Sequence, residues 1–441
     1  MNEGTRPRES VKISVEKALE IAIEFHKRGE VEDAIEIYGD ILSADPDNPD
    51  VVHYLGVAKH QLGESDEAIE LLRKSLELAP GNASAINNLG NIYRETGELE
   101  RAEECYRDVL SFAPQHVDAL INMGISLRGL GKTDQAHAVI KEAIEADPNH
   151  PQAWHNLGNI CRDLKRFDDA LSAYTRAGEL DLTSNDSLLE LAMLLVLSGR
   201  LDDAIERLQF VLKRDPENSV AKHTLAAACG EDIPDRASDD YVRHTFDKYA
   251  ASFDESLAKL EYRAPNRVAD EVLAFAGERK LDILDIGCGT GLCGPLIRPV
   301  ANRLVGVDLS PAMLAKAKRR QVYDDLAEAE LTAYLRESDA QYDIIICVDT
   351  LVYFGKLDEA VAAAGDRLRS GGCLVFTVER HGEDVSKEAY RLQHHGRYSH
   401  SDGYLSETVA AAGLELARLE HIIPRTESGE PVSGALVVVH K

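Results

Sequence analysis

The sequence LDILDIGCGTGLCGPLIR, residues 281–298, indicates how the C-terminal half of the chain folds. Apolar residues dominate its first six positions, with Asp285 near their end, and a glycine-rich turn and a potential helix start follow. This pattern predicts a buried parallel strand that turns sharply into a helix whose first backbone N–H groups stay free for a ligand. Glycine suits such a turn because a side chain would block the ligand's approach to the backbone. We expect a binding turn for a nucleoside cofactor, formed by Gly287, Gly289, Gly291 and Gly294.

Two cofactors compete for this turn. Read as G-x-G-x-x-G, Gly289 to Gly294 fit a dinucleotide fingerprint, and Asp308 stands nineteen residues after Gly289, near the place of the ribose-binding acid. Read as D-x-G-x-G-x-G, Asp285 to Gly291 resemble the first motif of class I S-adenosylmethionine-dependent methyltransferases. Asp285 favours the second interpretation, because a carboxylate there attracts the ammonium group of a methionine moiety and repels a pyrophosphate. NAD and a degenerate domain without a cofactor are the alternatives.

The resemblance to these methyltransferases implies roles for individual residues. The turn glycines would lie under the methionine and ribose, Asp308 would accept the ribose hydroxyls, and the two residues Leu309 and Met313 would flank the adenine. Glu330 matches the acidic position that contacts the adenine amino group, and Asp349 lies where methyl group and acceptor meet. The cofactor-binding residues expected on this resemblance are Asp285, Gly287, Gly289, Gly291, Asp308, Leu309, Met313, Glu330 and Asp349.

Strand-like and helix-like segments alternate from this motif to the end of the chain. Repeated strand–helix units predict a parallel sheet with right-handed crossovers and with ligands at the carboxyl ends of its strands. The two closing apolar segments, 414–422 and 433–440, predict an antiparallel hairpin at one edge. Together with the resemblance, this implies an α/β Rossmann-like class I methyltransferase domain over residues 241–441, with a seven-stranded, mostly parallel sheet.

The N-terminal half repeats itself every 34 residues. Small residues recur in phase, among them Gly56 and Gly90, and an alanine follows each at a fixed distance. The pattern resembles the tetratricopeptide repeat, which implies two amphipathic helices per unit and stacking into an all-α solenoid with a concave groove. We expect six repeats and a capping helix within residues 15–229. The repeat that matches the pattern best carries Trp154, Leu157, Gly158, Ala170 and Tyr174.

Amide and guanidinium side chains recur on the helices expected to line that groove. Their spacing is similar to the asparagine-ladder repeats of the O-linked N-acetylglucosamine transferases. Such amides can hydrogen-bond an extended peptide, and arginines can bind its carboxylates, so we expect a protein or peptide partner. A surface for self-association and an inert spacer are the alternatives. The groove candidates are Asn88, Asn91, Arg94, Asn122, Arg128, Asn156, Asn159 and Arg162.

The composition limits the partners of both halves. The 441 residues carry a formal net charge of −28, which repels phosphate, so we expect no nucleic acid and no membrane as a partner. Seven scattered cysteines without a CxxC pair indicate reduced thiols, and we expect no metal site. The polar tail 1–14 does not resemble a signal peptide, and no apolar run suits a membrane span, so we expect a cytoplasmic protein.

Residues 230–240, GEDIPDRASDD, interrupt both the repeat and the hydrophobic pattern and predict a linker. Aromatic residues then recur at helical spacing from Tyr241 to Phe253. These aromatic side chains either dock short helices on the domain behind them or form a lid over the cofactor, with Tyr249 as the candidate.

The acceptor is the least determined part. A sulfonium methyl group is already activated, so the protein mainly aligns the reacting atoms and excludes water. No Asn-Pro-Pro-Tyr or Asp-Pro-Pro-Tyr follows the fourth strand, which disfavours nucleobase amines. The basic, histidine-rich segment 379–405 is expected to hold an acidic substrate, with a solvated lid as the alternative. The catalytic candidates are Tyr249, His395, Arg397 and Tyr398.

Together these patterns favour an S-adenosylmethionine-dependent methyltransferase whose repeats recruit a protein or carrier-bound substrate. One alternative is an adaptor with a regulatory or vestigial cofactor-binding domain. Another is a small-carboxylate O-methyltransferase whose repeats only form oligomers, because the small-molecule relatives of this resemblance act on carboxylates such as trans-aconitate and malonyl thioesters.

Overall fold

The computed structural model describes residues 13–181, 185–381, 388–427 and 429–441. The polar tail therefore lies outside the described residues up to position 12. The chain divides into two compact units, Met1–Ser187 and Leu188–Lys441. Each unit is described by itself below.

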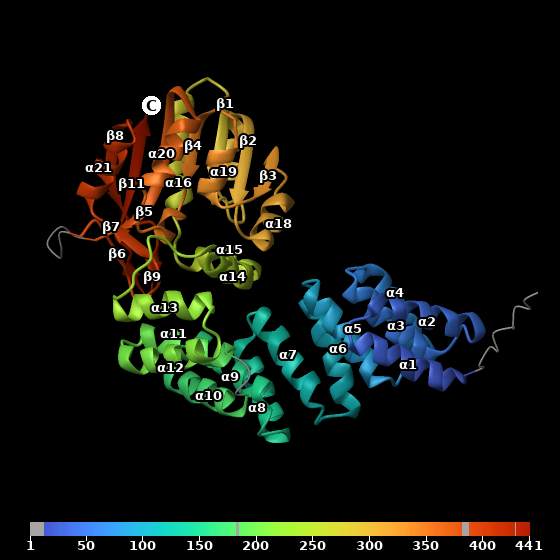
Figure 1. Ribbon diagram of the computed structural model, residues 1–441. Coiled ribbons are helices and arrows are strands. Elements are labelled where there is room, and N and C mark those ends of the chain that lie inside the picture. Colours follow the sequence, from blue (N-terminus) through green and yellow to red (C-terminus); the bar gives the residue numbers. More distant parts are fainter. Residues whose placement is uncertain (1–12, 182–184, 382–387, 428) are drawn as a thin grey trace, which may run out of the picture. The chain divides into compact units, whose positions relative to one another are not determined.

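Paired helices build the repeats, as expected (Figure 1). The alanines at the fixed position of the second helices are fully buried, because the two helices of each pair approach there. The helices are α1 (Val15–Lys27), α2 (Val31–Ala44), α3 (Pro49–Gln61), α4 (Ser65–Leu78), α5 (Ala83–Glu95), α6 (Leu99–Phe112), α7 (Val117–Gly129), α8 (Thr133–Ala146), α9 (Pro151–Asp163), α10 (Phe167–Leu180), α11 (Asp186–Leu197), α12 (Leu201–Arg214) and the capping helix α13 (Ser219–Cys229).

The glycine of the first helix in a repeat makes room for a large side chain of the second helix. A Cβ on Gly90 would lie 2.8 Å from the Tyr106 ring, and a Cβ on Gly158 would lie 2.5 Å from the Tyr174 ring. Both tyrosines are fully buried. In these two helix pairs, the small and the aromatic position of the repeat pattern thus form one packing contact.

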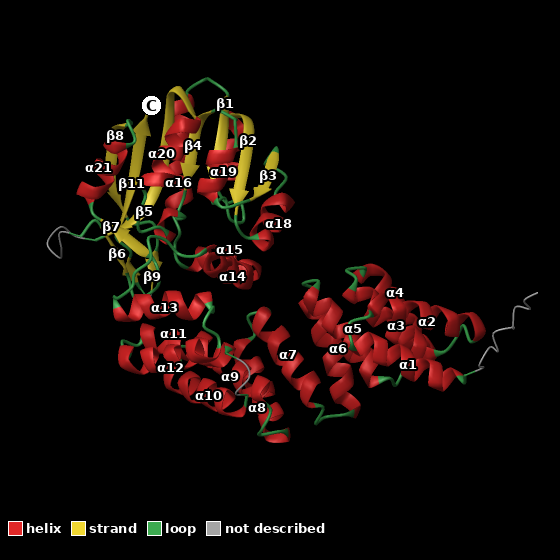
Figure 2. Ribbon diagram, in the orientation of Figure 1, coloured by secondary structure: helices red, strands yellow, loops and turns green. Residues whose placement is uncertain are grey.

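The C-terminal unit contains a mixed sheet in the strand order β3-β2-β1-β4-β5-β11-β8 (Figure 2). The first five strands of this order run parallel, and β11 is antiparallel to both β5 and β8, so the expected mostly parallel sheet with a closing hairpin is confirmed along a path of seven strands. The hairpin of residues 390–400 adds two short strands to this sheet by pairing with the end of β5. The strands are β1 (Leu281–Ile286), β2 (Ala301–Asp308), β3 (Asp325–Glu328), β4 (Tyr342–Cys347), β5 (Leu368–Arg380), β6 (Tyr390–Leu392), β7 (Tyr398–His400), β8 (Glu415–Ile422), β9 (Thr426–Glu427), β10 (Glu430–Pro431) and β11 (Gly434–His440).

Apolar side chains cover both faces of this sheet. Leu281 and Ile283 of β1 pack with α16 and α17, whereas Leu284 and Ile286 pack with α19, α20 and α21. This alternation is why β1 reads as an almost continuous apolar run. The remaining helices are α14 (Asp239–Tyr249), η1 (Ala250–Ser252), α15 (Phe253–Lys259), α16 (Ala264–Ala276), α17 (Gly294–Ile297), η2 (Arg298–Val300), α18 (Pro311–Arg319), α19 (Leu331–Glu337), η3 (Leu351–Tyr353), α20 (Asp358–Arg367) and α21 (Asp402–Ala411).

The capping helix and the linker pack on the sheet domain within the C-terminal unit. Ala227 of α13 lies in one apolar cluster with Leu392 and Tyr398 of the β6–β7 hairpin, a hairpin that sequence reasoning treated as a loop. His223 Nε2 lies 2.8 Å from the Gly396 carbonyl oxygen, and Arg236 forms a β-bridge with Phe354. The segment expected to separate two domains is thus continuous in packing with the second one.

Candidate functional site

A cavity opens where the parallel strands end. It holds about 970 Å³ of empty space, part of it open to solvent, which is enough for a nucleoside-sized ligand. The turns after β1, β2 and β4 form its floor, and α14 and α15 cover it. The arrowheads of β1 and β2 point toward these two helices in Figure 2. Of the nine expected cofactor residues, the cavity is lined by Asp285, Gly287, Gly289, Asp308, Leu309, Glu330 and Asp349.

Asp285 places a buried carboxyl group at the end of β1. Only 1% of the residue is exposed, and its Oδ2 accepts a hydrogen bond of 2.7 Å from the Tyr323 hydroxyl. Burial raises the pKa of Asp285 to about 7, while the Tyr323 hydroxyl lowers it and the nearby Asp308 carboxylate raises it further. A cation in the cavity would favour the ionised form of this group.

Glycine is favoured at each position of the turn for a different physical reason. A Cβ on Gly287 would lie 2.0 Å from Thr350 Oγ1, and a Cβ on Gly291 would lie 2.9 Å from the Tyr323 ring. Gly291 does not line the cavity, so its small size serves packing and not a ligand. A Cβ on Gly289 would meet no atom within 4 Å, and this backbone is the part of the turn that faces open space.

Asp308 and Glu330 follow β2 and β3. Asp308 accepts backbone hydrogen bonds from Gly289 N at 2.8 Å and Ser310 N at 2.9 Å, yet burial outweighs them and raises its pKa. Glu330 caps α19, where Oε2 accepts from Ala333 N at 2.8 Å. Its Oε1 is buried without a hydrogen-bond partner among the described residues. A ligand with an N–H donor would satisfy that oxygen.

Met313 and Tyr249 do not line the cavity. Met313 is 1% exposed on α18. The cover is formed instead by neighbours of Tyr249, chiefly Phe246, Phe253 and Tyr262, because these positions face the cavity from α14, α15 and the segment that follows.

Two aspartates of the cover fix it to the floor. Asp247 accepts hydrogen bonds from the Ser310 hydroxyl and the Ala312 backbone, and Asp254 accepts one from the Thr290 hydroxyl. Arg320 binds Asp254 as well. The cover is therefore held on the binding turn and on the start of α18.

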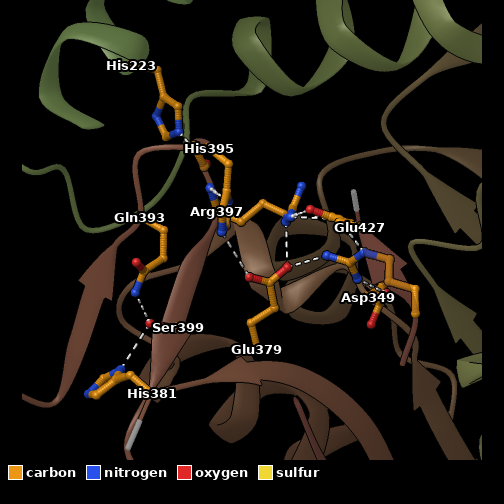
Figure 3. A network of polar contacts seen from close by, with 11 residues as sticks. His223, Asp349, Glu379, His381, Gln393, His395, Arg397, Ser399 and Glu427 are labelled. Atoms are coloured by element: carbon orange, nitrogen blue, oxygen red, sulfur yellow. Dashed lines mark hydrogen bonds and ion pairs between the residues drawn. The ribbon is translucent and has the colours of Figure 1, made fainter. Parts of the chain in front are cut away.

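A buried ionic network stands behind Asp349 (Figure 3). Arg425, 5% exposed, donates to Asp349 Oδ2 at 2.6 Å, to Glu427 Oε1 at 2.7 Å and to Glu379. Arg397 binds Glu379 and Glu427 in the same cluster. Asp349 has a left-handed backbone with φ of 52°, a costly conformation for a non-glycine residue that the network and Thr377 hold in place.

None of the four described catalytic candidates lines the cavity. His395 Nε2 lies 3.5 Å from Glu379, and burial lowers the pKa of this histidine. Tyr398 is fully buried and its hydroxyl donates to the Pro234 carbonyl oxygen, while Arg397 belongs to the network. Sequence reasoning missed Tyr262, which lines the cavity, and the only sequence signal was an aromatic residue before the first strand.

Most groove candidates with described contacts already bond within the repeats. Asn91 accepts from Tyr106 and Asn122, Asn159 accepts from Tyr174, and Asn156 donates to the Gln152 carbonyl oxygen. Asn88 pairs with His53 at 2.8 Å, and Arg128 binds Asp163. Arg162 lies 3.9 Å from Asp163. On α5, however, Asn87 Oδ1 and Arg94 Nε are buried without a hydrogen-bond partner in the described residues.

The residues described show neither a metal site nor a membrane span. No group of three or more His, Cys, Asp or Glu side chains among them could hold a metal ion. Within the same residues, no helix is both long enough and apolar enough to cross a membrane.

Comparisons with known proteins match two successive stretches of the chain to two different families. Residues 11–255 match the family described as the cilia and flagella-associated protein 70 C-terminal domain, and residues 284–374 match a methyltransferase domain. The chain is 30% identical over 138 residues to a malonyl-[acyl-carrier protein] O-methyltransferase of Acetivibrio thermocellus, covering 31% of this chain and 48% of that protein. It is 35% identical over 124 residues to methyltransferase-like protein 27 of Homo sapiens, covering 27% and 49%. The chain thus spans about half the length of these curated relatives.

Among solved structures, the pilF protein of Pseudomonas aeruginosa is similar with a TM-score of 0.43 and 20% identity, over 48% of this chain and 96% of that one.

Proposed function

The chain belongs to the helical-repeat family of the cilia and flagella-associated protein 70 C-terminal domain and carries a methyltransferase domain, and from this premise we propose that it transfers a methyl group from S-adenosylmethionine to a protein or carrier-bound acceptor that its repeats recruit. The observation that carries the proposal is the cavity at the glycine turn, with Asp285 buried at its floor.

The chemistry of the lining residues fits this cofactor. Asp285 offers a carboxylate to an ammonium group, and the open backbone of Gly289 offers space for the chain that joins it to the ribose. Asp308 has lone pairs left for hydroxyl donors. The partnerless Oε1 of Glu330 is the acceptor that an adenine amino group needs.

Methyl transfer does not require the protein to form a covalent bond with the substrate. When bound, the cofactor supplies a methyl group on a positively charged sulfur. The protein's own residues then have to align the acceptor with that carbon and exclude water. The cover suits this task, because Phe246 and Phe253 present apolar rings to the cavity. Asp247 holds α14 on the start of α18, and Asp254 holds α15 on the turn.

Recruitment by the repeats rests on α5. Asn87 and Arg94 are seven positions apart and so lie on one helix face, each with a buried polar atom that lacks a described partner. Together they offer an acceptor and a charged donor, the pair that an extended peptide with an acidic side chain would satisfy.

Titration calorimetry with S-adenosylmethionine tests the cofactor. We expect wild type to bind it, Asp308→Ala to bind it at least about tenfold more weakly, and Asp325→Ala to match wild type. Asp325 is a suitable control because it lies on the adjacent strand, exposed and paired with Arg303. Absence of heat with the folded wild-type protein would leave the adaptor with a vestigial domain as the better description.

A further inference from the structure

The acceptor side of the cavity is apolar and aromatic. Besides the strand ends and the turns that follow them, the wall of the cavity is formed by residues of the cover, the linker, α16 and η3. Phe246 packs edge-to-face against Phe253 and Tyr353, with ring centroids 5.9 Å and 5.4 Å apart. The apolar and aromatic lining residues of this wall are Val242, Phe246, Phe253, Leu257, Tyr262, Pro265, Tyr353 and Phe354.

Negative charge dominates the same cavity. Arg236 is the only lysine or arginine among the described lining residues, and it is bound to Asp239. Against this single guanidinium stand five carboxyl groups; Asp285, Asp308 and Glu330 are proposed for the cofactor, and Asp239 and Asp349 remain for the acceptor.

The arginines behind Asp349 do not change this balance. The segment around Arg397 was expected to form a positive wall for an acidic substrate. In the described residues, Arg397 and Arg425 instead face three carboxylates, those of Asp349, Glu379 and Glu427 (Figure 3). All three nitrogens of the Arg425 guanidinium are used in these contacts, so an acceptor carboxylate would have to displace a buried partner.

Burial is costly for the ionised form of three lining carboxyl groups. Burial raises the pKa of Asp285, Asp308 and Asp349, and for Asp349 it outweighs the opposing effect of Arg425. A cationic guest would relieve this cost, whereas an anionic guest would increase it.

We propose, on the premise of the methyltransferase activity above, that the acceptor is a primary amine at the end of an apolar stem, the chemistry of a lysine side chain. The aromatic wall suits the stem and attracts an ammonium group through the ring faces. Asp239 and Asp349, the lining carboxyl groups that are not proposed for the cofactor, favour the same cation over a carboxylate. Small acids are thereby disfavoured as acceptors.

The reaction balances without a further reactant. The ammonium group first gives one proton to water. Its nitrogen then forms a bond to the methyl carbon while the bond from that carbon to sulfur breaks, and the bonding electron pair stays on sulfur. The product is a secondary ammonium group, S-adenosylhomocysteine and one released proton.

Probe binding tests the charge preference without turnover. The full chain is saturated with S-adenosylhomocysteine and titrated with hexylamine, hexanol or hexanoate, which share one stem and differ in charge. We expect hexylammonium to bind at least about tenfold more tightly than hexanoate, with hexanol between them. Equal or tighter binding of hexanoate overturns the proposal, and so does binding of neither charged probe at millimolar concentration. Failure of S-adenosylhomocysteine itself to bind overturns the methyltransferase activity, so the two failures are distinct.

A variant and a labelling experiment add independent readouts. Asp349→Asn removes one carboxylate from Arg425, so hexanoate should gain severalfold in affinity and hexylammonium should lose severalfold; Asp325→Asn should leave their ratio unchanged. An unchanged ratio in folded Asp349→Asn contradicts the charge argument. Tritiated methyl groups transferred to protein should resist strong base, as N-methyl groups do, and release of the label as methanol would identify carboxyl esters and overturn the proposal.

Discussion

Replacing Asp285 by asparagine should raise the stability of the free protein and lower its affinity for the cofactor. Burial raises the pKa of Asp285 from 3.8 in the unfolded chain to about 7. The group therefore favours folding below pH 3.8 and loses that contribution as the pH rises through about 7. The shift corresponds to about 4 kcal/mol in total, of which about 2 to 3 kcal/mol falls between about pH 5 and about pH 8. Asparagine keeps an oxygen for the Tyr323 hydroxyl but never ionises.

Calorimetric melting of the free protein at about pH 5 and about pH 8 measures this effect. We expect the stability gain of Asp285→Asn to be larger at the higher pH. Trp154 is the only tryptophan of the chain and lies in the repeats, so its fluorescence identifies the transition of the N-terminal unit and leaves the other to the domain of interest.

Asp282 on the same strand provides a matched control of opposite sign. Hydrogen bonds from Asn302 and Arg369 lower the pKa of Asp282, so its ionised form stabilises the fold above the ordinary pKa of 3.8. Asp282→Asn should therefore lower the melting temperature at about pH 8, where Asp285→Asn raises it.

Cofactor binding supplies the second half of this prediction. An ion pair at about 4 Å in an effective dielectric of about 20 amounts to about 4 kcal/mol before desolvation, so we expect a loss of about tenfold to hundredfold in affinity for Asp285→Asn. Wild-type affinity should also fall as the pH drops below about 7, and the variant should not show this dependence. A variant that melts like wild type at high pH and binds the cofactor as tightly would refute the reasoning.

Three further outcomes follow from the packing. A fragment of residues 188–441 should melt at a higher temperature than one of residues 241–441, which lacks α13 and its apolar contact with β6–β7; equal circular-dichroism melts would contradict this. Arg425→Met should lower the free energy of unfolding in urea by about 3–5 kcal/mol, because Asp349 loses its ion-pair partner and the buried Glu379 keeps only Arg397, and a loss below about 1 kcal/mol would speak against the network. In methyl-labelling assays, Arg94→Gln should raise the KM for a recruited acceptor more than Arg128→Gln does, since Arg94 contacts Glu95 through one nitrogen and keeps a partnerless Nε, whereas Arg128 binds Asp163 through two nitrogens; similar effects would count against the groove on α5.

Much of the fold could be predicted from patterns within short stretches of the sequence. Repeats at a fixed period require the same packing contact each time, so the small residue at Gly90 and its large neighbour Tyr106 stand out as a recurring pair of positions along the chain. The strand and turn at 281–298 are equally local, because their apolar run, aspartate and glycines are consecutive.

Contacts between segments that are distant in the sequence could not be predicted in the same way. The network joins Asp349, Glu379 and Arg425 from three separate elements, and no spacing in the sequence links them. For this reason Arg397, read as a positive charge open to a substrate, is paired in the structure. Tyr249 illustrates the same difficulty on a helix, where a shift of three positions to Phe246 decides which aromatic ring faces the cavity.

The sequence alone determined the repeat architecture, the sheet domain and the turn that would hold the cofactor, because each depends on residues close together in the chain. Only the tertiary structure shows why each of three positions in that turn is a glycine. A Cβ on Gly287 would clash with Thr350, and one on Gly291 would clash with Tyr323, whereas one on Gly289 would meet open space. The tertiary structure also decided the charge of the acceptor side, since that charge is a balance among carboxylates and guanidinium groups that only folding brings within reach of one another.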